Sequence, residues 1–177
     1  MRLAGALPPV RRTALVRAML AHVVERAQAA QAITQVCLIG PSRHGLPDNL
    51  PLLTDPGQGL NAALAAAVAH AAAHSATRVV ILPADLPRLT ANDINLLAAA
   101  PAGTIAIAPD RHGTGTNALS LPLPAAASFA FAFGPDSCAL HHAEVARLGL
   151  NLEEICSDSL AQDVDLPADL GDADGLL

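Results

Sequence analysis

The sequence contains no lysine, no tryptophan and no tyrosine, and phenylalanine occurs only three times in 177 residues. Without lysine the chain cannot carry the GxxxxGK[ST] phosphate loop of P-loop NTPases, and it cannot form a lysine Schiff base. All ten basic residues are arginine. Because aromatic residues are so few, the core must be built from alanine, leucine, valine and isoleucine, and alanine alone contributes 39 residues.

Cysteine is scarce as well, and Cys37, Cys138 and Cys156 contain no CxxC pair. An odd number without paired spacing predicts neither a disulfide framework nor a zinc site, so free thiols in a reducing compartment are expected. Early arginines interrupt any apolar signal segment, and the long uncharged stretches contain polar residues or several prolines. We therefore expect a cytoplasmic protein that does not enter a membrane.

Acidic residues outnumber basic residues by 16 to 10, which gives a net charge of −6 and argues against a general nucleic-acid binder. The charge is uneven, since residues 1–50 carry +4 and residues 51–177 carry −10. An acidic part facing a basic segment could hold a metal ion and an anionic substrate between them. Ordinary surface solvation explains the same distribution.

Helical and strand-like patterns alternate along the chain. Apolar spacing predicts helices over 11–30, 60–74, 90–100 and 136–148, strands over 35–40, 52–53, 78–82, 104–108, 117–121 and 151–156, and a turn over 167–170. Thr90 and Asp136 are expected to cap their helices. The alternation predicts a single α/β domain over residues 1–177, with a mostly parallel sheet and helices on both faces.

Aspartates follow three of the predicted strands. Asp85 comes after the strand over 78–82, Asp110 follows the strand over 104–108, and Asp163 and Asp165 follow the last strand. Ligands of open α/β sheets lie beyond the carboxyl ends of the strands, and carboxylates gathered there are the hard oxygen ligands that Mg²⁺ requires. Such a metal would support phosphoryl or nucleotidyl transfer. Each aspartate taken alone could simply cap a turn or a helix.

Three glycine-containing segments could approach an anion or a nucleotide: residues 113–117 (GTGTN), 133–137 (FGPDS) and 55–61 (DPGQGLN). Interleaved glycines and hydroxyls expose backbone N–H groups, and a helix N-terminus adds more of them. Tight turns and an ordinary capped helix start are the alternatives.

Histidines give weaker signals. His70 and His74 lie one helical turn apart, but no HExxH motif accompanies them, so a solvated helix face is the simpler interpretation. His141 and His142 follow the 133–137 segment, where one of them could contact a phosphate, although a surface histidine explains them equally well.

Taken together, these motifs resemble one family. Residues 107–119 (IAPDRHGTGTNAL), then FGPDS at 133–137 with His141 one helical turn later, resemble the guanylyltransferases of coenzyme F420 biosynthesis. These enzymes use 2-phospho-L-lactate, phosphoenolpyruvate or 3-phospho-D-glycerate. Residues 55–64 (DPGQGLNAAL), 85–87 (DLP) and 163–167 (DVDLP) fit in the same order, so the resemblance covers roughly residues 2–170.

The resemblance implies a Rossmann-like nucleotidyltransferase fold that transfers GMP from GTP to a three-carbon phospho-acid, with Mg²⁺ as cofactor and pyrophosphate as the other product. It implies roles for three groups of residues: Asp85 and Asp163 as catalytic metal ligands supported by Asp165; Thr116, Gly134 and Ser137 around the phospho-acid; and Gly59, Leu60, Asn61 and Arg2 near the nucleotide. GTP and the phospho-acid are then the expected partners.

One departure from the family concerns the start of the sequence. Family members begin with a strand and a lysine-bearing loop, and residues 1–7 match only the end of that loop. We therefore expect a fold without its first strand, which would lie in the middle of the sheet, through either a late start codon or a true truncation. A non-catalytic binding remnant and another nucleotidyltransferase, such as the molybdenum-cofactor type, are the alternative functions. The choice of phospho-acid and the oligomeric state stay open, with a homodimer as one option.

Overall fold

The computed structural model describes residues 7–164, 169, 171 and 173. Its elements, in chain order, are α1 (Pro9–Ala29), β1 (Leu38–Gly40), β2 (Leu52–Thr54), α2 (Leu60–Ala73), β3 (Arg78–Ile81), α3 (Ala91–Ala98), β4 (Thr104–Pro109), β5 (Thr116–Pro122), α4 (Ser137–Leu148), β6 (Asn151–Glu154) and α5 (Asp158–Ala161). All four predicted helices and all six predicted strands are present, and α5 is the one element that the sequence patterns did not predict. The predicted turn over 167–170 lies, apart from residue 169, outside the described residues.

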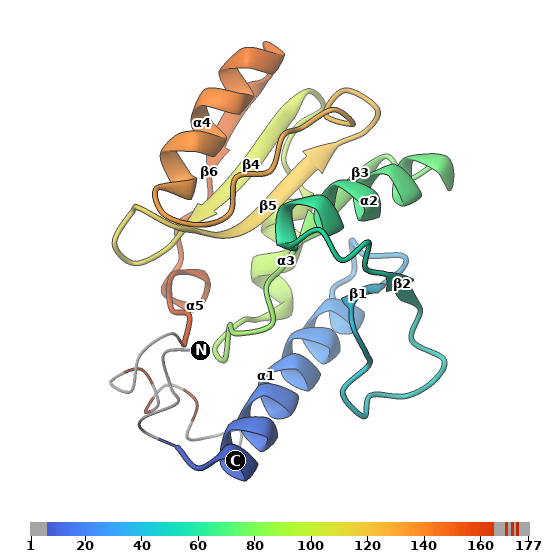
Figure 1. Ribbon diagram of the computed structural model, residues 1–177. Coiled ribbons are helices and arrows are strands. Elements are labelled where there is room, and N and C mark those ends of the chain that lie inside the picture. Colours follow the sequence, from blue (N-terminus) through green and yellow to red (C-terminus); the bar gives the residue numbers. More distant parts are fainter. Residues whose placement is uncertain (1–6, 165–168, 170, 172, 174–177) are drawn as a thin grey trace.

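The strands form two sheets (Figure 1), one of two strands in the order β1-β2 and one of four in the order β3-β5-β4-β6. In the larger sheet β5 is antiparallel to both of its neighbours, while β6 is parallel to β4. Three of the four strands therefore share one direction. β5 runs the other way because only six residues connect it to β4, and a parallel pair needs a crossover of about a dozen or more. That the first strand of the family is missing from this sheet stays a prediction.

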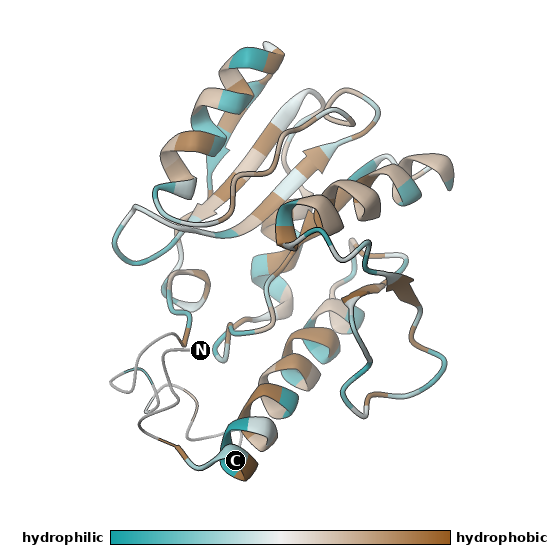
Figure 2. Ribbon diagram, in the orientation of Figure 1, coloured by the Kyte–Doolittle hydropathy of each residue, from teal (hydrophilic) through white to brown (hydrophobic). Residues whose placement is uncertain are grey.

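The two middle strands of the larger sheet, β4 and β5, are buried on both faces. Along β4 the side chains alternate, with Ile105 and Ile107 on one face and Ala106 and Ala108 on the other, and all four are fully buried. The alanine face packs against residues of α1 and α3, and the isoleucine face packs against residues of α2 and α4. Figure 2 shows the resulting apolar colouring along the strands. The prediction of helices on both faces is confirmed.

Thr90 caps α3 as predicted. Its hydroxyl accepts the Asp93 N–H at 3.2 Å, and the Asp93 carboxylate accepts the Thr90 N–H at 2.9 Å. Ser157 and Ser159 also donate to this carboxylate, at 2.9 and 2.7 Å, which ties α3 to the start of α5. Burial alone would raise the pKa of Asp93, but these hydrogen bonds outweigh it and lower the pKa below its ordinary value.

The predicted cap of α4 is wrong. Asp136 precedes the helix in the left-handed conformation, with φ of 57°, and its side chain makes no capping hydrogen bond. Asp136 therefore forms a tight backbone turn that leads into α4. The first N–H groups of this helix have no side-chain cap. None of the described helices is long and apolar enough to cross a membrane.

Candidate functional site

One edge of the larger sheet collects most of the predicted site residues. The register pairs Ile81 of β3 with Leu119, Pro109 of β4 with Thr116, and Ile107 of β4 with Glu154 of β6. The carboxyl ends of β3, β4 and β6 and the beginning of β5 therefore lie at the same edge. The segments that follow these strands, and Thr116 itself, meet there as the open α/β rule requires.

Asp85 and Asp163 come together at this edge. The N–H of Val164, the residue after Asp163, donates to the backbone carbonyl of Asp85 at 3.1 Å. The chain before Asp163 is anchored to the sheet, because the Asn117 side-chain amide donates to the Leu160 carbonyl at 2.9 Å. Both aspartates are partly exposed, so they offer hard oxygen donors that suit a divalent cation. Asp165 and Arg2, also predicted for the site, lie outside the described residues.

Asp110 organises the glycine-rich loop between β4 and β5. Its Oδ1 accepts the N–H groups of His112 at 3.1 Å and Thr114 at 2.9 Å. A Cβ placed on Gly115 would lie 2.8 Å from the other carboxylate oxygen, so only glycine fits beside it. Burial would raise the pKa of Asp110, but the backbone hydrogen bonds outweigh it and lower the pKa. The Asp110 carboxylate, which the sequence suggested as a metal ligand, therefore stabilises the glycine-rich loop between β4 and β5.

Arg111 connects this loop to later parts of the chain. Its backbone N–H donates to the Ala161 carbonyl at 2.9 Å, and its guanidinium lies 2.6 Å from the carboxylate of Asp169, whose side chain is only 5% exposed. The loop after β4 and the segment near Asp163 are consequently held against each other.

Thr116 and His141 form a buried pair behind the loop. The Thr116 Oγ1 lies 2.9 Å from Nδ1 of His141, and the backbone N–H of Ala132 donates to Nε2 of the same ring at 3.1 Å. An N–H can only donate, so Nε2 must be the unprotonated nitrogen and Nδ1 carries the proton. Nδ1 then donates to the threonine oxygen, which leaves the hydroxyl proton of Thr116 available to a ligand.

The His141 ring is held neutral by its surroundings. Burial is the largest cause and lowers its pKa to about 4, with a further lowering by His142 and an opposing effect of Glu144. The rings of Phe129 and Phe133 lie 5.5 and 4.9 Å from the imidazole, and Phe131 contacts both of them. All three phenylalanines of the chain are thus gathered beside this histidine.

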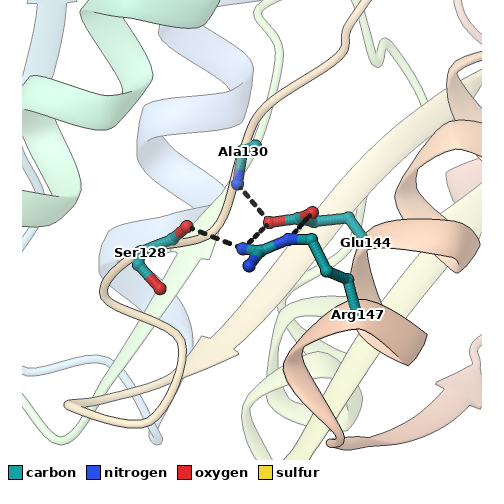
Figure 3. Close-up of polar contacts among 4 residues, drawn as sticks. All are labelled: Ser128, Ala130, Glu144 and Arg147. Atoms are coloured by element: carbon teal, nitrogen blue, oxygen red, sulfur yellow. Dashed lines mark hydrogen bonds and ion pairs between the residues drawn. The ribbon is translucent and has the colours of Figure 1, made fainter.

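Two further contacts position the segment before α4 (Figure 3). The buried Glu144 accepts the Ala130 N–H at 2.7 Å and binds the Arg147 guanidinium in a bidentate pair at 2.6 and 2.7 Å, and Arg147 also donates to the Ser128 carbonyl at 3.4 Å. The hydrogen bonds from Arg147 lower the pKa of Glu144. The carboxylate therefore ties residues 128–130 to α4.

Asn61 holds the same segment from α2. Its Oδ1 accepts the Phe133 N–H at 2.9 Å, and its Nδ2 donates to the Phe133 carbonyl at 3.3 Å. The sequence suggested that the Asn61 amide would face a base or ribose. In the structure this amide binds the backbone of Phe133. A contact between Asn61 and a nucleotide stays a prediction.

The remaining predicted residues expose backbone at two helix starts. Gly134 (φ 139°) precedes α4 and Gly59 (φ 90°) caps α2, and no atom lies within 4 Å of a Cβ placed on either. Neither helix has a side-chain cap, whereas Thr90 and Ser157 cap α3 and α5. The first N–H groups of α2 lie beside open space and suit an anion, whereas in α4 the N–H groups of Ser137 and Cys138 donate to the carbonyls of Gly134 and Thr114. Two cavities, of about 560 and 230 Å³, are lined by other residues.

The structure therefore places Thr116, Ser137 and Gly134 in one group and Asp85 and Asp163 in another at the same sheet edge. Sequence reasoning missed the roles of His141, Glu144 and Asn117. The signal for His141 was present, because it follows Ser137 by four residues and so lies on the same side of α4. No local pattern pointed to Glu144 or Asn117, whose partners are distant in sequence.

Known proteins of similar sequence match nearly the whole chain. The family model described as "Guanylyl transferase CofC like" matches residues 1–173. The phosphoenolpyruvate guanylyltransferase of Sphaerobacter thermophilus is 40% identical over 179 residues, which cover 98% of this chain and 86% of the relative. The 2-phospho-L-lactate guanylyltransferase of Halorubrum lacusprofundi is 34% identical over 173 residues, covering 97% of this chain and 76% of the relative.

Solved structures agree on the fold. A candidate nucleotide-diphospho-sugar transferase from Desulfovibrio desulfuricans superposes with a TM-score of 0.67 at 16% identity, over 87% of this chain and 71% of the other. A hypothetical transferase from Thermus thermophilus gives 0.57 at 22% identity, over 86% of this chain and 85% of the other. The predicted nucleotidyltransferase-like fold is confirmed.

Proposed function

The chain belongs to the family of CofC-like guanylyl transferases, and from this premise we propose that it transfers the guanylyl group of GTP to a three-carbon phospho-acid. A phosphate oxygen of the acid attacks the α-phosphorus of GTP, the bond from that phosphorus to the bridging oxygen breaks, and pyrophosphate leaves. The product serves coenzyme F420 biosynthesis. Phosphoenolpyruvate is the first acid to test, because the relatives from Sphaerobacter thermophilus and Conexibacter woesei are named for it.

The observation that carries the proposal is the hydrogen-bonding state of Thr116. His141 donates to its oxygen, so the proton of the threonine hydroxyl is left to be donated to a ligand. Ser137, at the start of α4, supplies a second hydroxyl. Two hydroxyls that can donate fit a phosphate, which accepts through all of its oxygens.

Nucleotidyl transfer of this type uses a divalent metal ion, and Mg²⁺ is the ion that we propose here. Asp85 and Asp163 would hold it, together with Asp165, because their carboxylates are the hard oxygen donors that Mg²⁺ prefers. When bound, the metal neutralises the negative charge that develops on the phosphates during transfer. The backbone hydrogen bond from the Val164 N–H to the Asp85 carbonyl keeps the segments that carry Asp85 and Asp163 together.

GTP would lie near Gly59, Leu60 and Asn61, at the uncapped start of α2. Free N–H groups there favour a phosphate or a polar edge of the guanine base. Asn61 links this helix start to Phe133, beside the proposed phospho-acid site. The two substrates would then approach each other at a common edge. A homodimer stays a prediction that size-exclusion chromatography with light scattering can test.

The test is pyrophosphate release from GTP and Mg²⁺ with each of the three acids in turn, in the presence of a deazaflavin acceptor. We expect release with at least one acid and none with Asp85→Asn. An exposed matched variant, Asp48→Asn, should keep the parent rate. No pyrophosphate from any acid would overturn the proposal. Measurable GTP binding without turnover would then favour the non-catalytic remnant.

A further inference from the structure

A second cluster of ligand-type side chains lies outside the residues assigned to guanylyl transfer. Cys138 and His142 are one turn apart on α4, and Glu154 is the last residue of β6. One ligand atom from each lies within 4.8 Å of the others. The Nε2 of His142 is 3.0 Å from Oε1 of Glu154 and 3.6 Å from Sγ of Cys138.

We propose that Cys138, His142 and Glu154 bind a divalent transition-metal ion, with zinc as the ion that the ligand set favours. Zinc binds sulfur at about 2.3 Å and imidazole nitrogen at about 2.0 Å in a tetrahedral arrangement, which separates the two ligand atoms by about 3.6 Å. The observed separation of Sγ and Nε2 is also 3.6 Å. The carboxylate of Glu154 lies within 4.8 Å of both other ligand atoms and would be the third ligand, and water would complete the fourth position.

The chemistry of this cluster differs from that of the Asp85 and Asp163 pair. A thiolate and an imidazole select zinc and related ions, whereas carboxylates alone suit magnesium. The two sites would therefore bind different metals.

Electrostatics also favour a cation between these side chains. The groups whose charges act on the Cys138 thiol are Glu154, Asp110 and Cys156, and all of them are acidic. Negative charge from the carboxylates of Glu154 and Asp110 favours a cation at this position.

The sequence did not reveal this cluster, because its three ligands come together only in the folded protein. Two ligands share a helix at positions i and i+4, but the third comes from a strand twelve residues later. A metal here would tie the first turn of α4 to β6. Ser137 precedes Cys138, and the Cys138 N–H donates to the Thr114 carbonyl at 3.1 Å, so the same ion would brace the start of α4.

The test is Co²⁺ binding to the reduced, tag-free protein, followed by competition with Zn²⁺. Thiolate ligation of Co²⁺ produces a charge-transfer band in the near ultraviolet, which carboxylate ligation does not. We expect one equivalent of Co²⁺ to produce this band and Zn²⁺ to abolish it. Cys138→Ser should remove the band, and His142→Gln and Glu154→Gln should each weaken Zn²⁺ binding by about tenfold or more.

Cys37→Ser is the matched control, since Cys37 is a free and exposed cysteine on a different segment, and it should leave the band unchanged. Circular dichroism checks that each variant folds; if Cys138→Ser does not, the half-exposed His142→Gln still tests the site through Zn²⁺ affinity. No band in the parent protein, a band that survives Cys138→Ser in a folded variant, or unchanged Zn²⁺ affinity in His142→Gln would overturn the proposal.

Discussion

Thr116 and His141 form a hydrogen-bonded pair, with Oγ1 and Nδ1 2.9 Å apart, inside the sheet edge that carries the proposed site. The Ala132 N–H occupies the other ring nitrogen, so the histidine can only donate to the threonine. The pair thereby occupies one acceptor position of the Thr116 hydroxyl and leaves its proton to be donated. That property is what a phosphate-binding residue needs.

Replacing Thr116 by valine keeps the shape of the side chain and removes its hydroxyl. The lost hydrogen bond to a charged phosphate should raise KM for the phospho-acid by about tenfold to a hundredfold, since such bonds contribute about 1.5–3 kcal/mol. Steady-state kinetics with varied phospho-acid measure this change. The matched control is Thr13→Val on the exposed face of α1, which should keep the parent KM.

The His141→Gln variant tests whether this histidine acts through Thr116. Glutamine cannot reproduce both ring contacts at once, so the threonine hydroxyl should lose its fixed role as a donor. We expect KM for the phospho-acid to rise with kcat less affected, and KM for GTP to stay near the parent value. If His141 had only a structural role, its replacement would change stability and kcat, and KM for the phospho-acid would not rise separately from KM for GTP. His74→Gln, on the exposed end of α2, is the control.

The Glu144 contacts hold residues 128–130 against α4, so Glu144→Ala should destabilise the fold. The Ala130 N–H would lose a hydrogen bond to a charged acceptor, which contributes about 1.5–3 kcal/mol. Urea unfolding measures the difference. Glu25→Ala is the matched control, because its pairing with Arg26 is exposed at 3.7 Å and should matter by less than about 1 kcal/mol. Equal losses in the two variants would contradict the assigned role of Glu144.

The Asp93 carboxylate should make part of the folding stability pH-dependent. Its pKa in the folded state lies below the ordinary value, because the hydrogen bonds from Thr90, Ser159 and Ser157 outweigh burial. A lowered folded pKa stabilises the protein above the unfolded pKa of about 4, and the stabilisation disappears as the pH falls through the folded value. Asp93→Asn should therefore be least stable relative to the parent at neutral pH, with the difference shrinking toward acidic pH. Urea unfolding across this range would contradict the assignment if the two curves stayed parallel.

Much of the fold could be predicted because local patterns dominate it. The apolar run over β4 and the helical spacing in α1 specify buried elements without long-range information. The antiparallel direction of β5 follows from a connection too short for a crossover, but applying that rule requires knowing that β4 and β5 pair. The α4 cap was predicted wrongly because Asp136 is a good cap by composition, and its left-handed backbone conformation leaves no sign in the residue type.

The site was only partly predictable for a similar reason. Asp85, Thr116 and Ser137 lie in recognisable motifs, and the strand ends bring them to one edge. The contacts that define their chemistry come from residues far away in sequence: Ala132 on His141, Asn61 on Phe133, and Asn117 on Leu160. Motif spacing cannot show which nitrogen of a histidine carries its proton.

The central claim is that the phospho-acid, and not water, attacks the α-phosphorus of GTP. The most direct measurement follows GTP labelled at that phosphorus, incubated with Mg²⁺, phosphoenolpyruvate and the protein, and separates the labelled products. The proposed function predicts that the label moves into a compound containing both GMP and the acid, with an equal amount of pyrophosphate, and that Asp163→Asn stops the transfer. Label recovered only as GMP, or GTP left intact with all three acids, would contradict it.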